Sequence, residues 1–217
     1  MNIVNQITMR ILTEAKDGES INSLASRIGV AYSAVYKWVA ELEKYEVINL
    51  IRKGNINAIK INKNLIYKKF RELEDAVSVV GKDKTFWNLI RNTKLRVRFV
   101  KGTAATIWTK GNFVTGDFYE RIYFLEVINE DLERLKRLLD KEKISYTEGR
   151  PSNKRPLIYI IKRENFNVDK DKGFPVMPLK ELVDWSEELH LENILEHLNN
   201  IHSLDLNARY SEVLTNA

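Results

Sequence analysis

The chain has 217 residues, of which 44% are hydrophobic and 30% charged, a composition typical of a globular protein with one sizeable core or two smaller ones. It contains no cysteine, which excludes disulfides and thiolate metal sites and favours a reducing environment. No apolar run approaches a membrane span and the first residues lack a secretory pattern, so we expect a cytoplasmic protein without a membrane partner.

The net charge of +5 is concentrated near the N-terminus. Residues 1–69 carry 11 Lys and Arg against 6 Asp and Glu, whereas residues 70–217 carry 24 of each. An excess of basic residues confined to one module favours a polyanionic partner for that module.

Short helices are predicted at the start of the chain. Apolar residues recur at helical spacing over residues 3–16. Ser20 can cap a second helix, and Gly29 can end it because glycine accepts left-handed backbone. A third helix is predicted over residues 33–45, with Val35 among its inward-facing residues.

A hairpin and a connecting helix follow. Residues 47–62 predict two short strands joined at a Gly-Asn turn. Residues 64–80 predict a connecting helix that stops at Gly81, and a further short helix is expected near residues 85–93.

The remainder predicts an α+β domain. The predicted strands are residues 95–102, 104–111, 120–128 and 155–163, and the predicted helices are residues 129–144, capped by Asn129, and two within residues 177–201. Alternation in the first strand predicts that Leu95, Val97 and Phe99 face inward, with Arg96 and Arg98 outward.

The most specific pattern lies in residues 21–40, INSLASRIGVAYSAVYKWVA. Ala25 falls where two helices would cross, Gly29 makes the turn, and Val35 and Trp38 anchor the second helix on the first. At this spacing the segment resembles the winged helix-turn-helix of MarR- and ArsR-like transcriptional regulators. A tryptophan at position 38 departs from the smaller aliphatic residue usual in that family.

The resemblance implies that residues 33–45 form a recognition helix for the major groove and that residues 47–62 form a wing. The implied DNA-contacting residues are Tyr32, Ser33, Ala34, Tyr36 and Lys37 on the helix, and Arg52, Lys53, Asn55, Asn57 and Lys60 on the wing. Hydroxyl groups can contact phosphates or base edges, lysine a phosphate or guanine, and alanine a thymine methyl.

We therefore predict an α+β DNA-binding transcriptional regulator, acting as a repressor on double-stranded DNA. Its predicted parts are a winged helix domain over residues 1–66, a connecting helix over residues 67–81, and an α+β domain over residues 82–217 that dimerises, senses an effector or binds a partner protein. A homodimer is expected because one recognition helix reads few base pairs.

Two alternatives stay open. The protein could be a protein–protein adaptor whose winged helix packs within an assembly. In layout the chain also resembles AbiEi-type antitoxins, and that resemblance implies autoregulation through the N-terminal domain and binding of a nucleotidyl-transferase toxin through the rest.

No catalytic residue, cofactor or metal site is predicted, so we expect a protein that is not an enzyme. Residues 79–85 lack both the first glycine and the magnesium-binding hydroxyl of a phosphate loop. His190, His197 and His202 are seven and five residues apart, whereas metal-binding pairs on a helix need spacings of three or four.

Two basic segments have alternative interpretations. Residues 82–110, with interleaved Trp87, Phe99 and Trp108, either extend the DNA-binding surface or contact a protein, and we favour a protein contact with the aromatic residues in the core. Residues 148–156 contain the Gly-Arg-Pro of a minor-groove AT-hook, but an acidic residue precedes it, which favours a polar connection between strands.

Overall fold

The computed structural model describes residues 3–54, 56–150 and 152–206. The protein is α+β, as predicted, and divides into two compact units, Met1–Ser78 and Val79–Ala217. None of the helices in the described ranges combines the length and apolarity needed to cross a bilayer.

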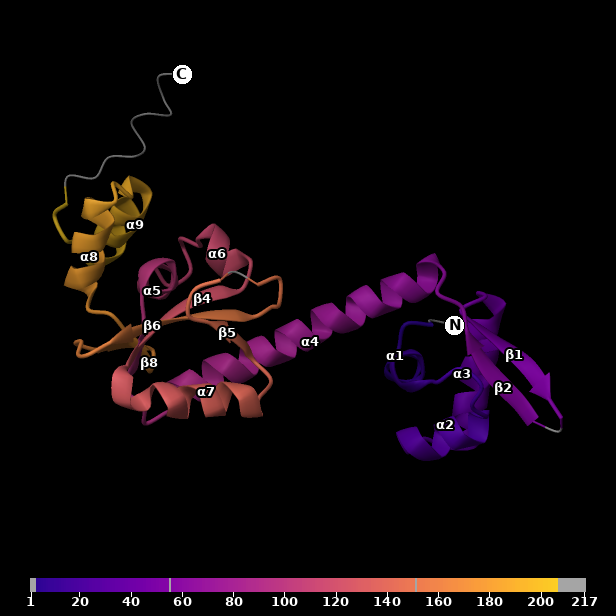
Figure 1. The fold of residues 1–217 in the computed structure, drawn as a ribbon. Coiled ribbons are helices and arrows are strands. Elements are labelled where there is room, and N and C mark those ends of the chain that lie inside the picture. The colour runs from indigo at the N-terminus through magenta and orange to yellow at the C-terminus, as the bar shows by residue number, and fades with distance from the viewer. Residues whose placement is uncertain (1–2, 55, 151, 207–217) are drawn as a thin grey trace, which may run out of the picture. The chain divides into compact units, whose positions relative to one another are not determined.

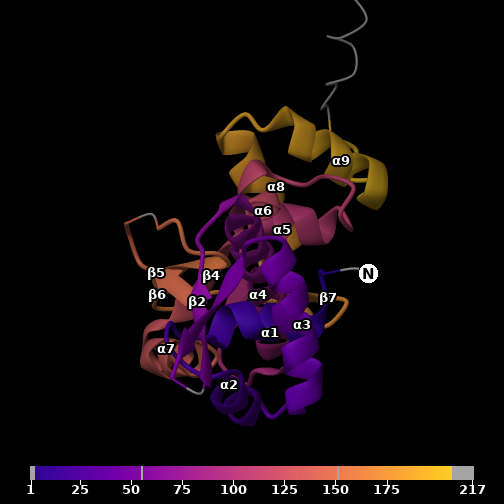
Figure 2. The same ribbon diagram turned by 90° about the vertical axis from the view of Figure 1, so that its right-hand side faces the viewer.

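In the first unit, the described residues 3–54 and 56–78 contain short helices followed by an antiparallel hairpin (Figure 1). The elements are α1 (Gln6–Glu14), α2 (Ile21–Ile28), α3 (Tyr32–Lys44), β1 (Ile48–Lys53) and β2 (Ile56–Ile61), followed by the start of α4 (Leu65–Asn92). Figure 2 shows α3 along its length, beside α1 and α2.

The predicted boundaries of α2 are confirmed by its capping geometry. The Ser20 side chain accepts a hydrogen bond from the amide of Ser23 at 3.1 Å, which satisfies one of the unpaired donors at the start of α2. Gly29 ends α2 in the left-handed conformation at φ 61°, where a side chain would be strained.

The first core forms where the helices and the hairpin meet. Its fully buried side chains include Ile11, Leu24, Ile28, Val35, Val39, Leu42, Ile48 and Ile59. Ala25 is 4% exposed, as expected for a small residue between α2 and α3, whereas Trp38 is only half-buried at the edge of the core.

The segment between α1 and α2 pairs with the hairpin. The amide of Gly18 donates to the carbonyl of Ile59 at 2.7 Å, and the amide of Ile59 donates to the carbonyl of Glu19 at 2.8 Å. A single bridge between Ser20 and Ala58 continues this pairing. The hairpin is therefore attached to the helices by backbone hydrogen bonds as well as by its apolar face.

One continuous helix, α4, replaces the two helices predicted around Gly81. Gly81 lies within it, exposed, and the predicted stop there is wrong. A glycine inside a helix costs only about 1 kcal/mol relative to alanine. The packing of α4 side chains such as Phe70 and Phe86 into the two cores can offset that cost.

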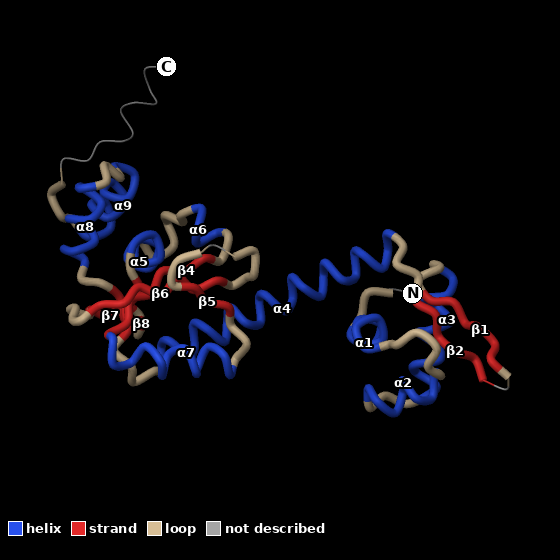
Figure 3. The backbone as a smooth tube through the Cα atoms, in the orientation of Figure 1, coloured by secondary structure: helices blue, strands red, loops and turns tan. Residues whose placement is uncertain are grey.

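The second unit contains, within its described residues, a six-stranded mixed sheet in the order β5-β6-β4-β3-β8-β7 (Figure 3). The strands are β3 (Val97–Phe99), β4 (Ile122–Ile128), β5 (Ser145–Thr147), β6 (Leu157–Arg163), β7 (Asp169–Asp171) and β8 (Phe174–Val176). Strands β4, β5 and β6 are parallel, β3 runs antiparallel to β4 and parallel to β8, and β7 runs antiparallel to β8.

Helices cover both faces of this sheet (Figure 1). They are α5 (Lys101–Trp108), α6 (Gly116–Tyr119), the 3-10 turn Asn129–Asp131, α7 (Leu132–Lys141), α8 (Leu179–Glu188) and α9 (Glu192–His202). Helix α7 lies on the face opposite α5 and α6. The end of α4 contributes Phe86 and Ile90 to the second core, where the Phe86 and Tyr123 rings stack with centroids 5.5 Å apart.

Three sequence predictions for this unit are wrong. The predicted strand over residues 104–111 is instead largely helix α5, whose residues Gly102–Thr106 are all buried, so its sequence lacks an amphipathic period. Asn129 opens the 3-10 turn, and Asp131 occupies the N-cap position of α7. Arg98 points inward and is 6% exposed, because a carboxylate on the neighbouring strand pairs with it.

Candidate nucleic-acid interface

Helix α3 has one buried face and one exposed face. Val35, Val39 and Leu42 are fully buried, at the spacing of one helical stripe. On the outward side Tyr32 is 50% and Tyr36 46% exposed. The structure brings these residues together with exposed Ser33 and Lys37, whereas Ala34 is half-buried at the margin.

The two tyrosines of this exposed face are held against each other. They lie one helical turn apart, with ring centroids at 6.0 Å and an interplanar angle of 27°. The Nζ atom of Lys37 lies 5.8 Å from the ring centroid of Trp38. The face therefore presents two phenols, a hydroxyl and an ammonium group on a rigid helix.

The candidate residues on the hairpin divide between its two faces. Arg52 pairs in register with Asn57 next to the turn, on the same face as Leu50 and Ile59. Lys60 pairs with Asn49 on the other face, at the end of the hairpin away from the turn. The predicted set therefore does not form one cluster on the hairpin.

The turn of the hairpin orients Arg52. Gly54 has a φ of 59°, and its carbonyl accepts a hydrogen bond from Nε of Arg52 at 3.4 Å. Lys53 is the last residue of β1 and pairs with Ile56, and Asn55 lies outside the described residues.

Sequence reasoning missed two apolar residues on this hairpin. Ile51 is 42% and Ile56 55% exposed, on the face opposite Arg52. The alternation of the strand could have identified them, because Ile51 is one residue out of phase with the inward-facing Ile48 and Leu50.

Several carboxylates of the first unit are engaged in structural contacts. Arg27 binds Glu19 at 2.7 Å and Glu14 at 3.6 Å, while Lys44 binds Glu41 at 2.7 Å. The hydrogen bond from Lys44 to Glu41 raises the pKa of that ammonium group.

Two further carboxylates accept backbone hydrogen bonds. Glu43 accepts from the amide of Leu50 at 3.1 Å, and Asp17 from the amide of Ile61 at 2.7 Å. In contrast, among the residues that the structure describes, Lys37, Arg52 and Lys60 form no ion pair. The outer side of α3 and the hairpin therefore each carry positive charge that no described carboxylate pairs with.

The histidines lie in contacts that do not resemble a metal centre. Nε2 of His202 lies 2.9 Å from the carbonyl oxygen of Trp108, and the ring of His197 lies 5.5 Å from that of Phe113. His190 is exposed next to the end of α8. Over residues 3–54, 56–150 and 152–206, no three His, Asp or Glu side chains gather as a metal site would require.

The basic stretch over residues 82–110 does not form one surface. Phe99 is fully buried, and Trp87 and Trp108 are half-buried against the core, as favoured from the sequence. Arg98 is buried with a carboxylate partner, which removes its charge from any surface.

The described residues of the connection between β5 and β6 form structural contacts. Glu148 binds Lys136 at 2.7 Å and Lys162 at 3.1 Å, and hydrogen bonds from these two lysines lower the pKa of its carboxyl group. Arg155 donates to the carbonyl of Ser152 at 2.7 Å.

No family model matches the sequence, and neither a curated protein nor a solved structure matches the chain.

Proposed function

We propose that this protein is a DNA-binding transcriptional regulator, a repressor whose first unit is a winged helix-turn-helix. The observation that carries the proposal is the exposed face of α3, where Tyr32, Tyr36 and Lys37 stand on a helix anchored by a fully buried opposite face. A helix held in this way by a preceding short helix and a tight turn can enter a major groove.

The hairpin supplies the second contact of the proposed interface. Arg52 and Asn57 at its turn would contact backbone phosphates or the adjacent minor groove. Residues 1–69 carry 11 Lys and Arg against 6 Asp and Glu, and this excess of positive charge favours approach to a polyanion. Each cation placed against a phosphate adds about 0.9 to the slope of log affinity against log salt.

A homodimer completes the proposal, and the first half of α4 offers a surface for it. Leu73 is 40% and Val77 62% exposed. With the buried Phe70 they follow the alternating three- and four-residue spacing of a heptad repeat. Together with Met9 of α1 they line an apolar groove of about 350 Å³. A second copy covering this surface would bring a second recognition helix to the DNA.

The test is an electrophoretic mobility shift of the full chain on the DNA upstream of its own gene, repeated at increasing salt. We expect binding that weakens with salt, and Lys37→Ala and Tyr36→Ala should each weaken it at least fivefold. Lys180→Ala is the matched control. This substitution removes one positive charge as Lys37→Ala does, and Lys180 is an exposed residue of α8 in the second unit. Unchanged binding by both α3 variants would reject the assigned surface.

A protein–protein adaptor is the second candidate, favoured by the same two tyrosines. Exposed tyrosines are enriched in protein interfaces, and Lys37 is the only basic residue on the outer side of the described helix α3 before its last turn. This alternative predicts no shift of duplex DNA at any salt concentration.

A further inference from the structure

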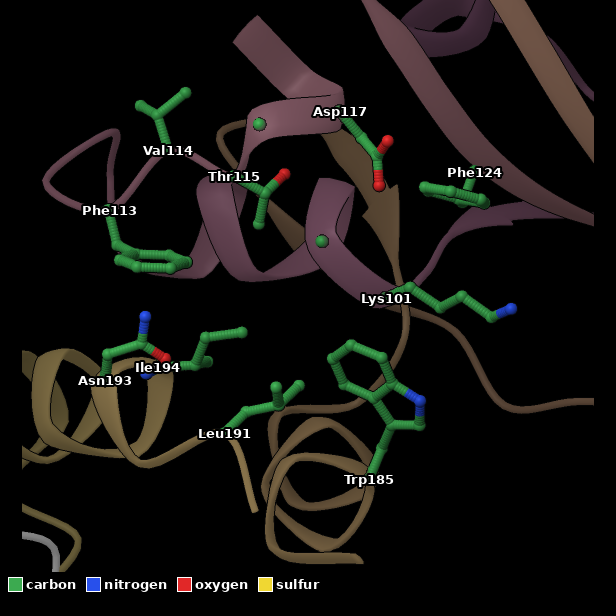
Figure 4. Close-up of a pocket in the computed structure, with 12 residues that line it drawn as sticks. Lys101, Phe113, Val114, Thr115, Asp117, Phe124, Trp185, Leu191, Asn193 and Ile194 are labelled. Atoms are coloured by element: carbon green, nitrogen blue, oxygen red, sulfur yellow. Dashed lines mark hydrogen bonds between the residues drawn. The ribbon is translucent and has the colours of Figure 1, made fainter. Parts of the chain in front are cut away.

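The second unit contains an open cavity of about 490 Å³ between α5, α6, α8 and α9 (Figure 4). Its volume is in the range of cavities that hold small molecules. One wall comes from α5 and α6 and the other from α8 and α9, which follow much later in the sequence. The first turn of α5 lies against the start of α6. A Cβ atom on Gly102 would come within 2.8 Å of Oγ1 of Thr115, so this wall is closely packed.

Two opposite charges line the cavity without neutralising each other. Lys101 begins α5 with a φ of 54°, and Asp117 lies in the first turn of α6. Both are exposed, and across the described ranges neither forms an ion pair. Figure 4 shows both side chains projecting toward the side of the cavity where Phe124 lies.

The other part of the cavity is mostly apolar, with the polar side chain of Asn193 at its margin. Phe113, Leu191 and Ile194 line it, and Figure 4 shows them away from the two charged groups. Figure 4 shows Trp185 on the side of Lys101, and within the described residues its indole N–H has no hydrogen-bond acceptor. A half-buried indole usually donates to a polar group, and a ligand could supply that acceptor.

We propose that this cavity binds a free L-α-amino acid with an apolar side chain. The ligand ammonium group pairs with Asp117, its carboxylate pairs with Lys101 and accepts from the indole of Trp185, and its side chain lies against Phe113, Leu191 and Ile194. This assignment does not depend on DNA binding by the first unit.

Charge complementarity distinguishes this ligand from others of similar size. A carboxylic acid without an amino group would leave Asp117 unpaired, and an amine without a carboxylate would leave Lys101 unpaired. A nucleotide would bring two negative charges or more toward a site with one ammonium and one carboxylate group. A zwitterion with an apolar tail matches all three features.

The experiment is isothermal titration of the full chain with L-leucine, L-isoleucine, L-phenylalanine, L-methionine and L-tryptophan. For the best of them, the amide and the deaminated acid are titrated in parallel, and AMP is titrated separately. We expect at least one amino acid to bind, with its amide and its deaminated acid each at least tenfold weaker. Binding of no amino acid, equal binding of the amide or the deaminated acid, or tighter binding of AMP would overturn the proposal.

Variants assign the binding to this cavity. Lys101→Met and Asp117→Asn, each confirmed as folded by circular dichroism, should each weaken binding at least tenfold. Lys94→Met and Asp169→Asn are the controls, since both residues are exposed in the same unit and do not line the cavity. Equal loss in the controls, or none in the first two variants, would place binding elsewhere and reject this site.

Discussion

Arg98 of β3 and Glu126 of β4 face each other across the antiparallel strand pair, and Nε of Arg98 donates to Oε2 of Glu126 at 2.7 Å. The two residues are 6% and 4% exposed. Glu126 also accepts from Nε of Arg163 at 2.9 Å, and Arg98 reaches Glu181 at 2.6 Å. Charges buried this deeply are stable only as a complete set, because each would otherwise lose its hydration without compensation.

Removal of Glu126 should therefore be costly. We expect Glu126→Ala to lower the free energy of unfolding by about 3–5 kcal/mol, because Arg98 stays buried without its main partner. Glu133→Ala is the control, since that side chain is 73% exposed in its pair with Lys136 and should change stability by less than about 0.5 kcal/mol. Urea unfolding followed by circular dichroism measures both, and equal effects would contradict the prediction.

Two glycines should respond oppositely to alanine. Gly102→Ala should destabilise the second unit by about 1–3 kcal/mol, since the new Cβ atom meets the β-branched Thr115. Gly81→Ala should stabilise by about 0.5–1 kcal/mol, because Gly81 lies inside a helix with no atom within 4 Å of the new methyl group. If both substitutions shift the melting temperature in the same direction, the packing described around Gly81 or around Gly102 is wrong.

The contribution of Glu148 should depend on pH. Lys136 and Lys162 lower the pKa of this carboxyl group in the folded state, so its stabilisation is complete above the unfolded pKa of about 4.3. It is lost as pH falls through the lower folded value, when the carboxylate takes up a proton. The stability difference between the protein and its Glu148→Gln variant should thus be largest near neutral pH and vanish in acid. A difference that grew on acidification would contradict this assignment.

The proposed dimer surface can be tested on α4. Val77→Lys places a charge within the exposed heptad stripe and should convert the dimer to monomers, because the charge would be buried without a partner. Leu65→Lys is the matched control, since Leu65 is 70% exposed at the start of the same helix and does not line the groove. Multi-angle light scattering at micromolar concentration measures the molar mass of both variants and of the unmodified protein. A monomeric unmodified protein would exclude the dimer itself.

The first unit could be predicted from sequence because its signals are local. Ser20, Gly29 and the apolar residues of α3 each determine structure within a few residues of themselves. Helix α5 could not be predicted, since it is buried all round and short apolar runs are compatible with both helix and strand. The inward direction of Arg98 depends on Glu126, which is distant along the chain.

The two candidate sites differ in the same way. Exposure of Tyr36 and Lys37 follows from the helical period of a single segment, so the sequence could predict it. The cavity with Lys101, Asp117 and Trp185 depends on how four helices pack on a sheet, and no spacing in the sequence relates these residues. The hairpin lies between these cases, because its turn was predictable while the division of its cations between two faces depends on strand register.

The backbone hydrogen bonds between Ile59 and the Gly18–Glu19 segment have a consequence for solubility. An uncovered strand edge offers unpaired amides and carbonyls to another molecule and can seed aggregation. Here the chain itself pairs with the edge of β2 around Ile59, so this part of the edge is not open to a further strand. The Ile59 amide should accordingly exchange its proton slowly, at the rate of opening of the helical unit rather than of hairpin fraying.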